Sequence, residues 1–216
     1  MSINRIENPY VMRIEDTTVV NNHFSGNHKD WDDKTEFDSF KENFRVIIRQ
    51  EQEKKCCFCK SYIKQRKQNA DIEHFIPKSK HKRFTFHPEN LAISCKRCNS
   101  VKSIHNPFDD SNIPNDSIEN YPRSSEFYSL VHPHFDDYYV NIRIIDNVLI
   151  QAVTDKGWNT VVRCALYEPE LAMDKAKEEL FNSENIKDVF MRLMMDYDDD
   201  DMQERLLIIL RNLNSI

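Results

Sequence analysis

The sequence predicts an α+β fold built around a small metal-stabilised core. Three observations indicate this class. Apolar residues recur at helical spacing in the N-terminal quarter and in the C-terminal third, residues 138–153 are rich in β-formers, and two Cys-x-x-Cys pairs enclose residues 56–98. With 216 residues and a mass of 25.8 kDa, the chain is long enough to bury a core without disulfides.

Three regions are expected along the chain. Residues 1–34 show no apolar period and are expected to be an irregular segment. Residues 35–105 hold the motifs and are expected to be the core. Residues 106–216 are expected to hold a hairpin and helices, and this region is either a structural part of the fold or a surface that binds a partner.

The core begins with a helix predicted over residues 36–53. A capping box marks its start, because Thr35 is followed three residues later by Asp38. Phe37, Phe40 and Phe44 then recur at three- and four-residue spacing, which is typical of an amphipathic helix.

The C-terminal region begins with a long loop predicted at residues 106–123, which contain three prolines and many Asn, Asp and Ser. Residues 138–145 and 148–153 predict a β-hairpin that turns at Asp146 and Asn147. Helical patterns follow at residues 159–166, 171–181, 186–194 and 202–213. The last of these is apolar on more than one side, so it is either buried in its own domain or docked on a partner.

Composition excludes several classes of protein. The chain has two glycines, Gly26 and Gly157, which is too few for a Gly-rich phosphate loop or a dinucleotide-binding fingerprint. No apolar run approaches the roughly 18 residues that span a membrane, and the N-terminus lacks the apolar stretch of a signal peptide. A cytoplasmic protein without membrane contact is therefore expected, and in that compartment cysteines are metal ligands more often than disulfide partners.

Charge is unevenly distributed along the chain. The formal net charge is −6, but residues 41–105 carry 16 basic and 6 acidic side chains, a local charge of +10 that leaves −16 for the remainder. A basic segment inside an acidic chain is typical of a protein with one face on a polyanion. The alternative is an ordinary solvated surface whose charges are merely uneven along the sequence.

The two Cys-x-x-Cys pairs predict a structural zinc site. Four thiolates from such pairs surround Zn²⁺ tetrahedrally and leave no open position, so the metal would stabilise the fold and take no part in a reaction. The predicted ligands are Cys56, Cys59, Cys95 and Cys98. Cys57 and Cys164 lack this spacing and are expected to pack as small apolar residues.

Between and just after the two pairs lie side chains suited to phosphodiester hydrolysis. Glu73 and Asn99 offer the hard oxygen ligands that Mg²⁺ or Mn²⁺ prefers. His74 is a candidate general base for water at neutral pH. Asn90 is expected to contact the second ring nitrogen of His74 and so to hold the imidazole in the required tautomer. These four residues are the predicted catalytic set.

The order of these motifs resembles the HNH endonucleases of the ββα-metal type. The resemblance rests on the two cysteine pairs, on Glu73-His74-x-x-Pro77-Lys78-Ser79, on Asn90-Leu91 and on Asn99-x-x-Lys102. It implies a β-hairpin and a helix clasped around one catalytic metal. It also implies that Glu73 and Asn99 are the metal ligands, that His74 is the base, and that Asn90 orients it.

A narrower resemblance is to the PtuB-like HNH proteins of Septu and retron-linked antiphage defence systems. It rests on residues 50–52, before the first cysteine pair, and on residues 72–79. It implies a nuclease effector subunit that acts with a PtuA-type ATPase on nucleic acid, with DNA favoured. The chain departs from that family at Ile76, where arginine is frequent before the proline, and in lacking a glycine within residues 80–86.

The predicted reaction is in-line hydrolysis, in which His74 takes a proton from water and the metal stabilises charge on the phosphate and the leaving 3′ oxygen. Basic side chains around the motif are candidates for backbone phosphate contacts, which set affinity and its salt dependence. They are Lys78, Lys80, Lys82, Arg83, Lys96, Arg97 and Lys102. The alternative function is a zinc-stabilised module that binds nucleic acid or protein without catalysis.

Overall fold

A computed structural model of the chain describes residues 5–63, 70–108 and 120–182. The chain divides into two compact units, Met1–Ile144 with Ile150–Tyr167, and Ile145–Leu149 with Glu168–Ile216. The boundaries predicted after residues 34 and 105 both fall inside the first unit, which also contains all the candidate site residues.

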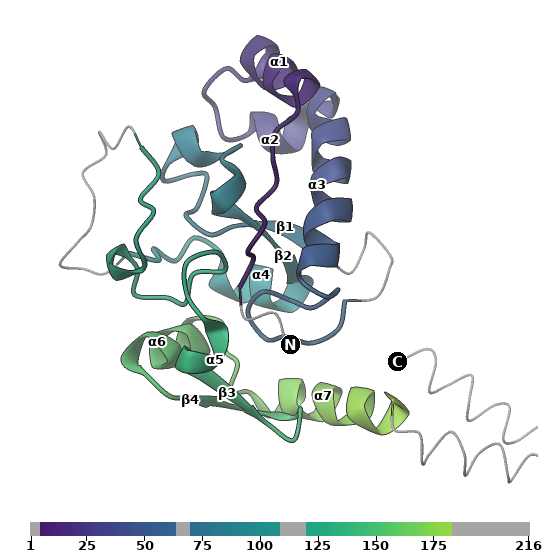
Figure 1. Ribbon diagram of the computed structural model, residues 1–216, viewed down its shortest axis with the longest axis vertical. Coiled ribbons are helices and arrows are strands. Elements are labelled where there is room, and N and C mark those ends of the chain that lie inside the picture. The colour runs from purple at the N-terminus through teal and green to yellow at the C-terminus, as the bar shows by residue number, and fades with distance from the viewer. Residues whose placement is uncertain (1–4, 64–69, 109–119, 183–216) are drawn as a thin grey trace, which may run out of the picture. The chain divides into compact units, whose positions relative to one another are not determined.

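The first unit combines a small antiparallel sheet with helices, which confirms the predicted α+β class. Strands β1 (Ala70–His74) and β2 (Leu91–Cys95) form the sheet, and helix α4 (Lys96–Lys102) follows β2 directly. Figure 1 shows this hairpin next to α4 and to the long helix α3 (Asp38–Glu51). Two strands followed by a helix are the ββα arrangement that the sequence predicts.

The register of the hairpin gives its two ends different side chains. Ala70 lies opposite Cys95 at one end, the cysteine end, and His74 lies opposite Leu91 at the other, the histidine end. Because side chains of a strand alternate between its two faces, Glu73 and His74 lie on opposite faces of β1.

Helix α3 buries an apolar face in the core of the first unit. Its Phe40, Phe44 and Ile48 are buried, as the helical spacing predicts. Just after the helix, Gln52 donates from Nε2 to the carbonyl oxygen of Ile93 (2.8 Å) and accepts at Oε1 from the Ile93 amide (2.7 Å). This buried pair of hydrogen bonds fixes the end of α3 to the edge of β2 that β1 leaves open.

The start of α3 differs from the prediction. Residues Thr35–Phe37 form a 3-10 turn, and α3 begins at Asp38 without a side-chain cap. The turn buries Phe37 completely. Burying such a ring stabilises a fold by about 1.5–3 kcal/mol, whereas a capping bond contributes about 1 kcal/mol, so burial decides the helix start.

The sequence predicts an irregular N-terminal segment, but this segment contains helices α1 (Ile14–His23) and α2 (Asp30–Asp33). The prediction was wrong because α1 has no apolar stripe. Its buried residue is Asp16, which accepts hydrogen bonds from the Tyr10 hydroxyl (2.5 Å) and from the Arg13 guanidinium (2.7 Å). A helix held by polar contacts leaves no apolar period in the sequence.

A second hairpin is confirmed in strands β3 (Ile142–Ile145) and β4 (Leu149–Ala152). Asp146 and Asn147 between them have positive φ angles of 50° and 58°, as a type I′ turn requires. The predicted first half of the leading strand is instead a short helix, α5 (Tyr138–Asn141), which begins where the Asp137 side chain accepts a hydrogen bond from the Tyr139 amide.

Helix α6 (Asp155–Arg163) follows this hairpin and overlaps the helix predicted at residues 159–166. Thr154 caps it by accepting a hydrogen bond from the Gly157 amide (3.0 Å). Glycine is required at position 157 because a Cβ there would lie 1.9 Å from the carbonyl oxygen of Asn141.

Helix α7 (Pro169–Asn182) belongs to the second unit and agrees with the helix predicted at residues 171–181. The helices predicted at residues 186–194 and 202–213 lie outside the described residues, as do residues 109–119 of the predicted loop. Within the part of the chain that the structure describes, no helix has both the length and the apolar character needed to cross a membrane.

Candidate functional site

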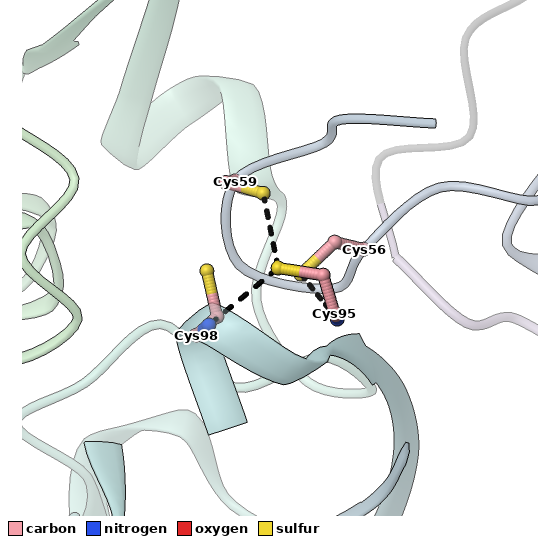
Figure 2. Close-up of side chains that lie close together, drawn as sticks. All are labelled: Cys56, Cys59, Cys95 and Cys98. Carbon is pink, nitrogen blue, oxygen red and sulfur yellow. Dashed lines mark hydrogen bonds between the residues drawn. The ribbon is translucent and has the colours of Figure 1, made fainter. Parts of the chain in front are cut away.

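Four cysteines from two chain segments meet at the cysteine end of the hairpin. Cys56 and Cys59 come from the loop after α3, Cys95 ends β2, and Cys98 lies in the first turn of α4. Their Sγ atoms all lie within 4.8 Å of one another, and those of Cys59 and Cys95 are 3.9 Å apart (Figure 2). Zinc with four bonds of about 2.3 Å separates its sulfur ligands by about 3.8 Å. The four predicted ligands therefore fit a tetrahedral metal.

Backbone amides donate hydrogen bonds to two of the four sulfurs. The amide of Cys95 donates to Sγ of Cys56 (3.3 Å), and the amide of Cys98 donates to Sγ of Cys95 (3.5 Å). Burial raises the pKa of the Cys56 thiol, but hydrogen bonds from the surrounding thiols outweigh burial and hold that pKa well below its usual range, while hydrogen bonds to Cys56 raise the pKa of Cys95 and Cys98. The thiolate is the form that binds metal. Cys57 and Cys164 are buried outside the cluster, as expected.

His74 lies at the histidine end, where a backbone group holds its ring. Its Nε2 is 3.0 Å from the carbonyl oxygen of Thr85. Because a carbonyl only accepts, Nε2 carries the proton and Nδ1 keeps the lone pair. The residue is 8% exposed, and its ring meets Trp31 edge-on with 4.5 Å between centroids. Burial and the charge of Lys78 lower the pKa of His74 to about 3, so the imidazole is neutral at physiological pH, as a general base must be.

Asn90 makes no hydrogen bond to this imidazole, which corrects its predicted orienting role. Its Oδ1 accepts from the Ile76 amide (2.7 Å) and from the Tyr121 hydroxyl (3.2 Å). Its Nδ2 donates to the carbonyls of Ile76 and Phe84, each at 3.0 Å. These bonds use every donor and acceptor site of the side chain, so none remains for the ring. Asn90 instead joins the two ends of the loop between β1 and β2.

Glu73 is paired with a lysine in the interior of the first unit. Nζ of Lys102 lies 2.5 Å from Oε1 of Glu73 and donates to the carbonyl oxygen of His74 at 3.2 Å. Both charged side chains are buried, Lys102 completely. Burial raises the pKa of Glu73, and the Lys102 ammonium acts against that rise. Because Lys102 is enclosed in this pair, its predicted contact with nucleic-acid phosphate was wrong.

Asn99, the second predicted metal ligand, lies beside a carboxylate. Its Nδ2 donates to Oδ2 of Asp71 at 2.9 Å. Asp71 and Glu73 share one face of β1, and Asn99 and Lys102 lie three residues apart on α4, so the four side chains meet between strand and helix. Carboxylate and amide oxygens are the donors that a hard divalent cation prefers, and Asp71, Glu73 and Asn99 offer three such groups, with the Lys102 ammonium against Oε1 of Glu73.

The other predicted phosphate-contact residues fall into two groups. Four are exposed: Lys80, Lys82, Arg83 and Lys96. Two are engaged within the protein, because Lys78 pairs with Asp32 (2.9 Å) and Arg97 donates to the carbonyl oxygen of Ala165 (2.7 Å). The four exposed side chains therefore present the charge that a polyanion would meet.

Sequence reasoning missed three groups at this site. The Thr85 carbonyl is a backbone atom, so no residue type signals its role. Trp31 comes from the segment expected to be irregular. Asp71 did leave a signal, since it stands two residues before Glu73 and therefore faces the same way if that segment is a strand.

Comparison with known proteins concerns this segment. Residues 56–104 match the family model described as HNH endonuclease. In the same region the chain is 35% identical over 51 residues to the Septu protein PtuB of Bacillus thuringiensis, a stretch that covers 24% of this chain and 20% of that protein. The chain thus matches about a fifth of the length of this relative. Both findings confirm, for the matched segment, the resemblance inferred from its motifs.

Proposed function

We propose that this protein is a metal-dependent endonuclease that hydrolyses phosphodiester bonds in nucleic acid, with DNA favoured, because residues 56–104 match the HNH endonuclease family model. The state of His74 carries the proposal, since its Nε2 is bound to the Thr85 carbonyl and Nδ1 bears the lone pair. Glu73 precedes it in β1. A carboxylate and a base therefore lie on the two faces of one strand end.

In the proposed reaction, water attacks phosphorus in line with the P–O3′ bond. Nδ1 of His74 takes a proton from the attacking water, the P–O3′ bond breaks, and the departing oxygen takes up a proton, which leaves a 5′-phosphate and a 3′-hydroxyl. Glu73 and Asn99, with Asp71 beside them, are the residues that would hold the catalytic ion. Bound there, Mg²⁺ or Mn²⁺ supplies Lewis-acid stabilisation of the charge on the phosphate and the leaving oxygen.

The zinc ion proposed for the four cysteines has a separate, structural task. Cysteine ligands at all four positions leave none for substrate. The ion would join the loop after α3 to β2 and to the first turn of α4. It would thereby fix the helix that carries Asn99 and Lys102 against the strand that carries Glu73.

Similarity to the Septu protein PtuB supports a further part of the proposal. This chain is proposed to be the nuclease subunit of a cytoplasmic antiphage defence system and to act with a PtuA-type ATPase. Residues 106–216, which follow the matched residues 56–104, are proposed to contribute the surface for that partner. Co-purification with an ATPase encoded by a neighbouring gene tests the partnership, and free degradation of DNA by the chain alone would argue against its necessity.

A cleavage assay tests the activity. The protein, with and without the ATPase, is incubated with plasmid, linear DNA and RNA in Mg²⁺, Mn²⁺ or chelator. Cleavage is expected to require a divalent ion and to fall at least about 100-fold in Asn99→Ala, which removes an oxygen ligand. Asn43→Ala, whose side chain bonds the Ser39 carbonyl within α3, is the control and should cleave as the wild type does. Binding without cleavage under every condition would favour the non-catalytic zinc module.

A further inference from the structure

The position of the His74 ring depends on buried contacts that begin outside the HNH segment. Thr85 holds the ring, and Asn90 holds the backbone of the residue before Thr85. Behind Asn90 lie the side chains of Tyr121 and His132, which follow the matched residues 56–104. Tyr121 is 6% exposed and His132 is fully buried.

Each hydrogen bond in this series has a defined direction. The backbone amide of His134 donates to Nδ1 of His132 (3.1 Å), so the neutral ring of His132 carries its proton at Nε2. That Nε2 donates to the Tyr121 hydroxyl (2.9 Å). The Tyr121 hydrogen is then left to donate to Oδ1 of Asn90 (3.2 Å), an atom that only accepts. Burial lowers the pKa of His132 well below its usual range, which favours this neutral form.

Packing restricts the two rings further. His87 stacks on Tyr121 with 4.4 Å between centroids and 13° between planes. His132 lies between Phe135, stacked at 4.2 Å, and Phe75, tilted at the same centroid distance. Side chains locked by both packing and hydrogen bonds are the kind of support that holds a reactive group in place.

We propose that Tyr121 and His132 are positioning residues of the nuclease: they fix Asn90 and, through the backbone at Phe84 and Thr85, the orientation and tautomer of His74. This inference rests on the proposed function of His74 as the general base. The Asn90 side chain bonds Ile76 near the start of the loop and Phe84 in its middle, so the loop follows any shift of that side chain. Misplacement of a reacting group by about 1 Å can lower a rate by about 100-fold.

Tyr121→Phe is the first test, because it removes one hydroxyl and keeps the ring. Tyr10→Phe is a matched control, since Tyr10 is 2% exposed, packs its ring on Phe40, and donates its hydroxyl to Asp16 (2.5 Å) instead of to a member of this series. In Tyr121→Phe we expect kcat to fall about tenfold with KM unchanged. In Tyr10→Phe we expect kcat to stay near that of the wild type.

Conservative and disruptive changes of His132 give a rescue test. In His132→Gln the side-chain amide nitrogen can still donate a hydrogen bond to Tyr121. In His132→Leu no donor remains at this position. We expect His132→Gln to retain more of the wild-type kcat than His132→Leu does. Equal kcat in the two variants, with equal folding by circular dichroism, would overturn the role of the His132 donor.

A second readout does not depend on cleavage. The ¹⁵N chemical shifts of the His74 imidazole distinguish the protonated Nε2 from the unprotonated Nδ1. We expect this difference to shrink in Tyr121→Phe and to remain in Tyr10→Phe. Unchanged shifts and kcat in Tyr121→Phe would overturn the positioning role. Absence of wild-type cleavage under every condition would overturn the proposed function, so the two failures are distinguishable.

Discussion

The two ends of the β1–β2 hairpin are stabilised in different ways. At the cysteine end, four sulfurs lie within 4.8 Å of one another, so one metal ion can join two chain segments. At the histidine end, Thr85, Asn90, Tyr121 and His132 form a series of hydrogen bonds between neutral groups. A metal site is lost when one ligand is lost, whereas hydrogen bonds can be removed singly. We therefore expect the metal at the cysteine end to stabilise the fold, and the hydrogen bonds at the histidine end to set the orientation of the His74 ring.

The largest effect is expected at the cysteine end. Cys98→Ser removes one metal ligand, and we expect loss of bound zinc and of more than about 4 kcal/mol of stability, because binding of a structural metal is coupled to folding. Zinc content and chemical denaturation measure the two effects. Cys57→Ser is the control, since Cys57 is buried outside the cluster and its variant should keep the metal. Zinc retained by Cys98→Ser would contradict the ligand set.

A second large effect is expected at Lys102, which contacts both Glu73 and the carbonyl of His74. Lys102→Met leaves Glu73 buried without its counter-ion and should cost about 3–5 kcal/mol. The double variant with Glu73→Gln should recover much of this loss, because the buried charge is then gone. Urea denaturation of the single and double variants measures the coupling, and simple additivity would show that the pair contributes nothing.

Asn90→Ala is expected to have an intermediate effect. It should cost about 2–4 kcal/mol, because the Ile76 amide and the other buried partners lose their hydrogen bonds. The zinc content should stay at the wild-type level, since the cysteine end is unaffected. Denaturation and zinc analysis of the same samples give both quantities. Release of the metal by Asn90→Ala would show that the two ends are not independent.

The smallest effect is expected at the rim of the histidine end. Arg123 donates to Glu89 at 2.7 Å, but the Arg123 side chain is 69% exposed. Arg123→Ala should therefore change stability by less than about 1 kcal/mol. Thermal unfolding compared with Asn90→Ala measures the difference. A loss as large as that of Asn90→Ala would mean that surface charge, and not the buried hydrogen bonds, stabilises this end.

The cysteine end was predictable because metal binding imposes a spacing on the sequence. Two Cys-x-x-Cys pairs identify Cys56, Cys59, Cys95 and Cys98, and no knowledge of the intervening 35 residues is needed to see that they can meet. The same holds for α3, whose phenylalanines repeat with the helical period, and for the turn at Asp146 and Asn147. In each case one local pattern determines the structure.

The histidine end was predictable only in part. Motif spacing located His74 and Asn90, but their partners leave no local pattern. The group that holds His74 is a backbone carbonyl, and Tyr121 is 31 residues from Asn90 along the chain. The prediction that Lys102 contacts phosphate fails because a count of charges cannot distinguish a buried ion pair from a solvated lysine.

Cleavage by His74→Ala is the most direct test of the central claim that this imidazole is the base of an endonuclease. Plasmid cleavage is followed with Mg²⁺ or Mn²⁺, with and without the ATPase, for the wild type, for His74→Ala and for His23→Ala, a half-exposed histidine of α1. We predict that His74→Ala lowers the rate at least about 100-fold while zinc content, folding and DNA binding stay unchanged. Cleavage by His74→Ala at the wild-type rate would contradict the account.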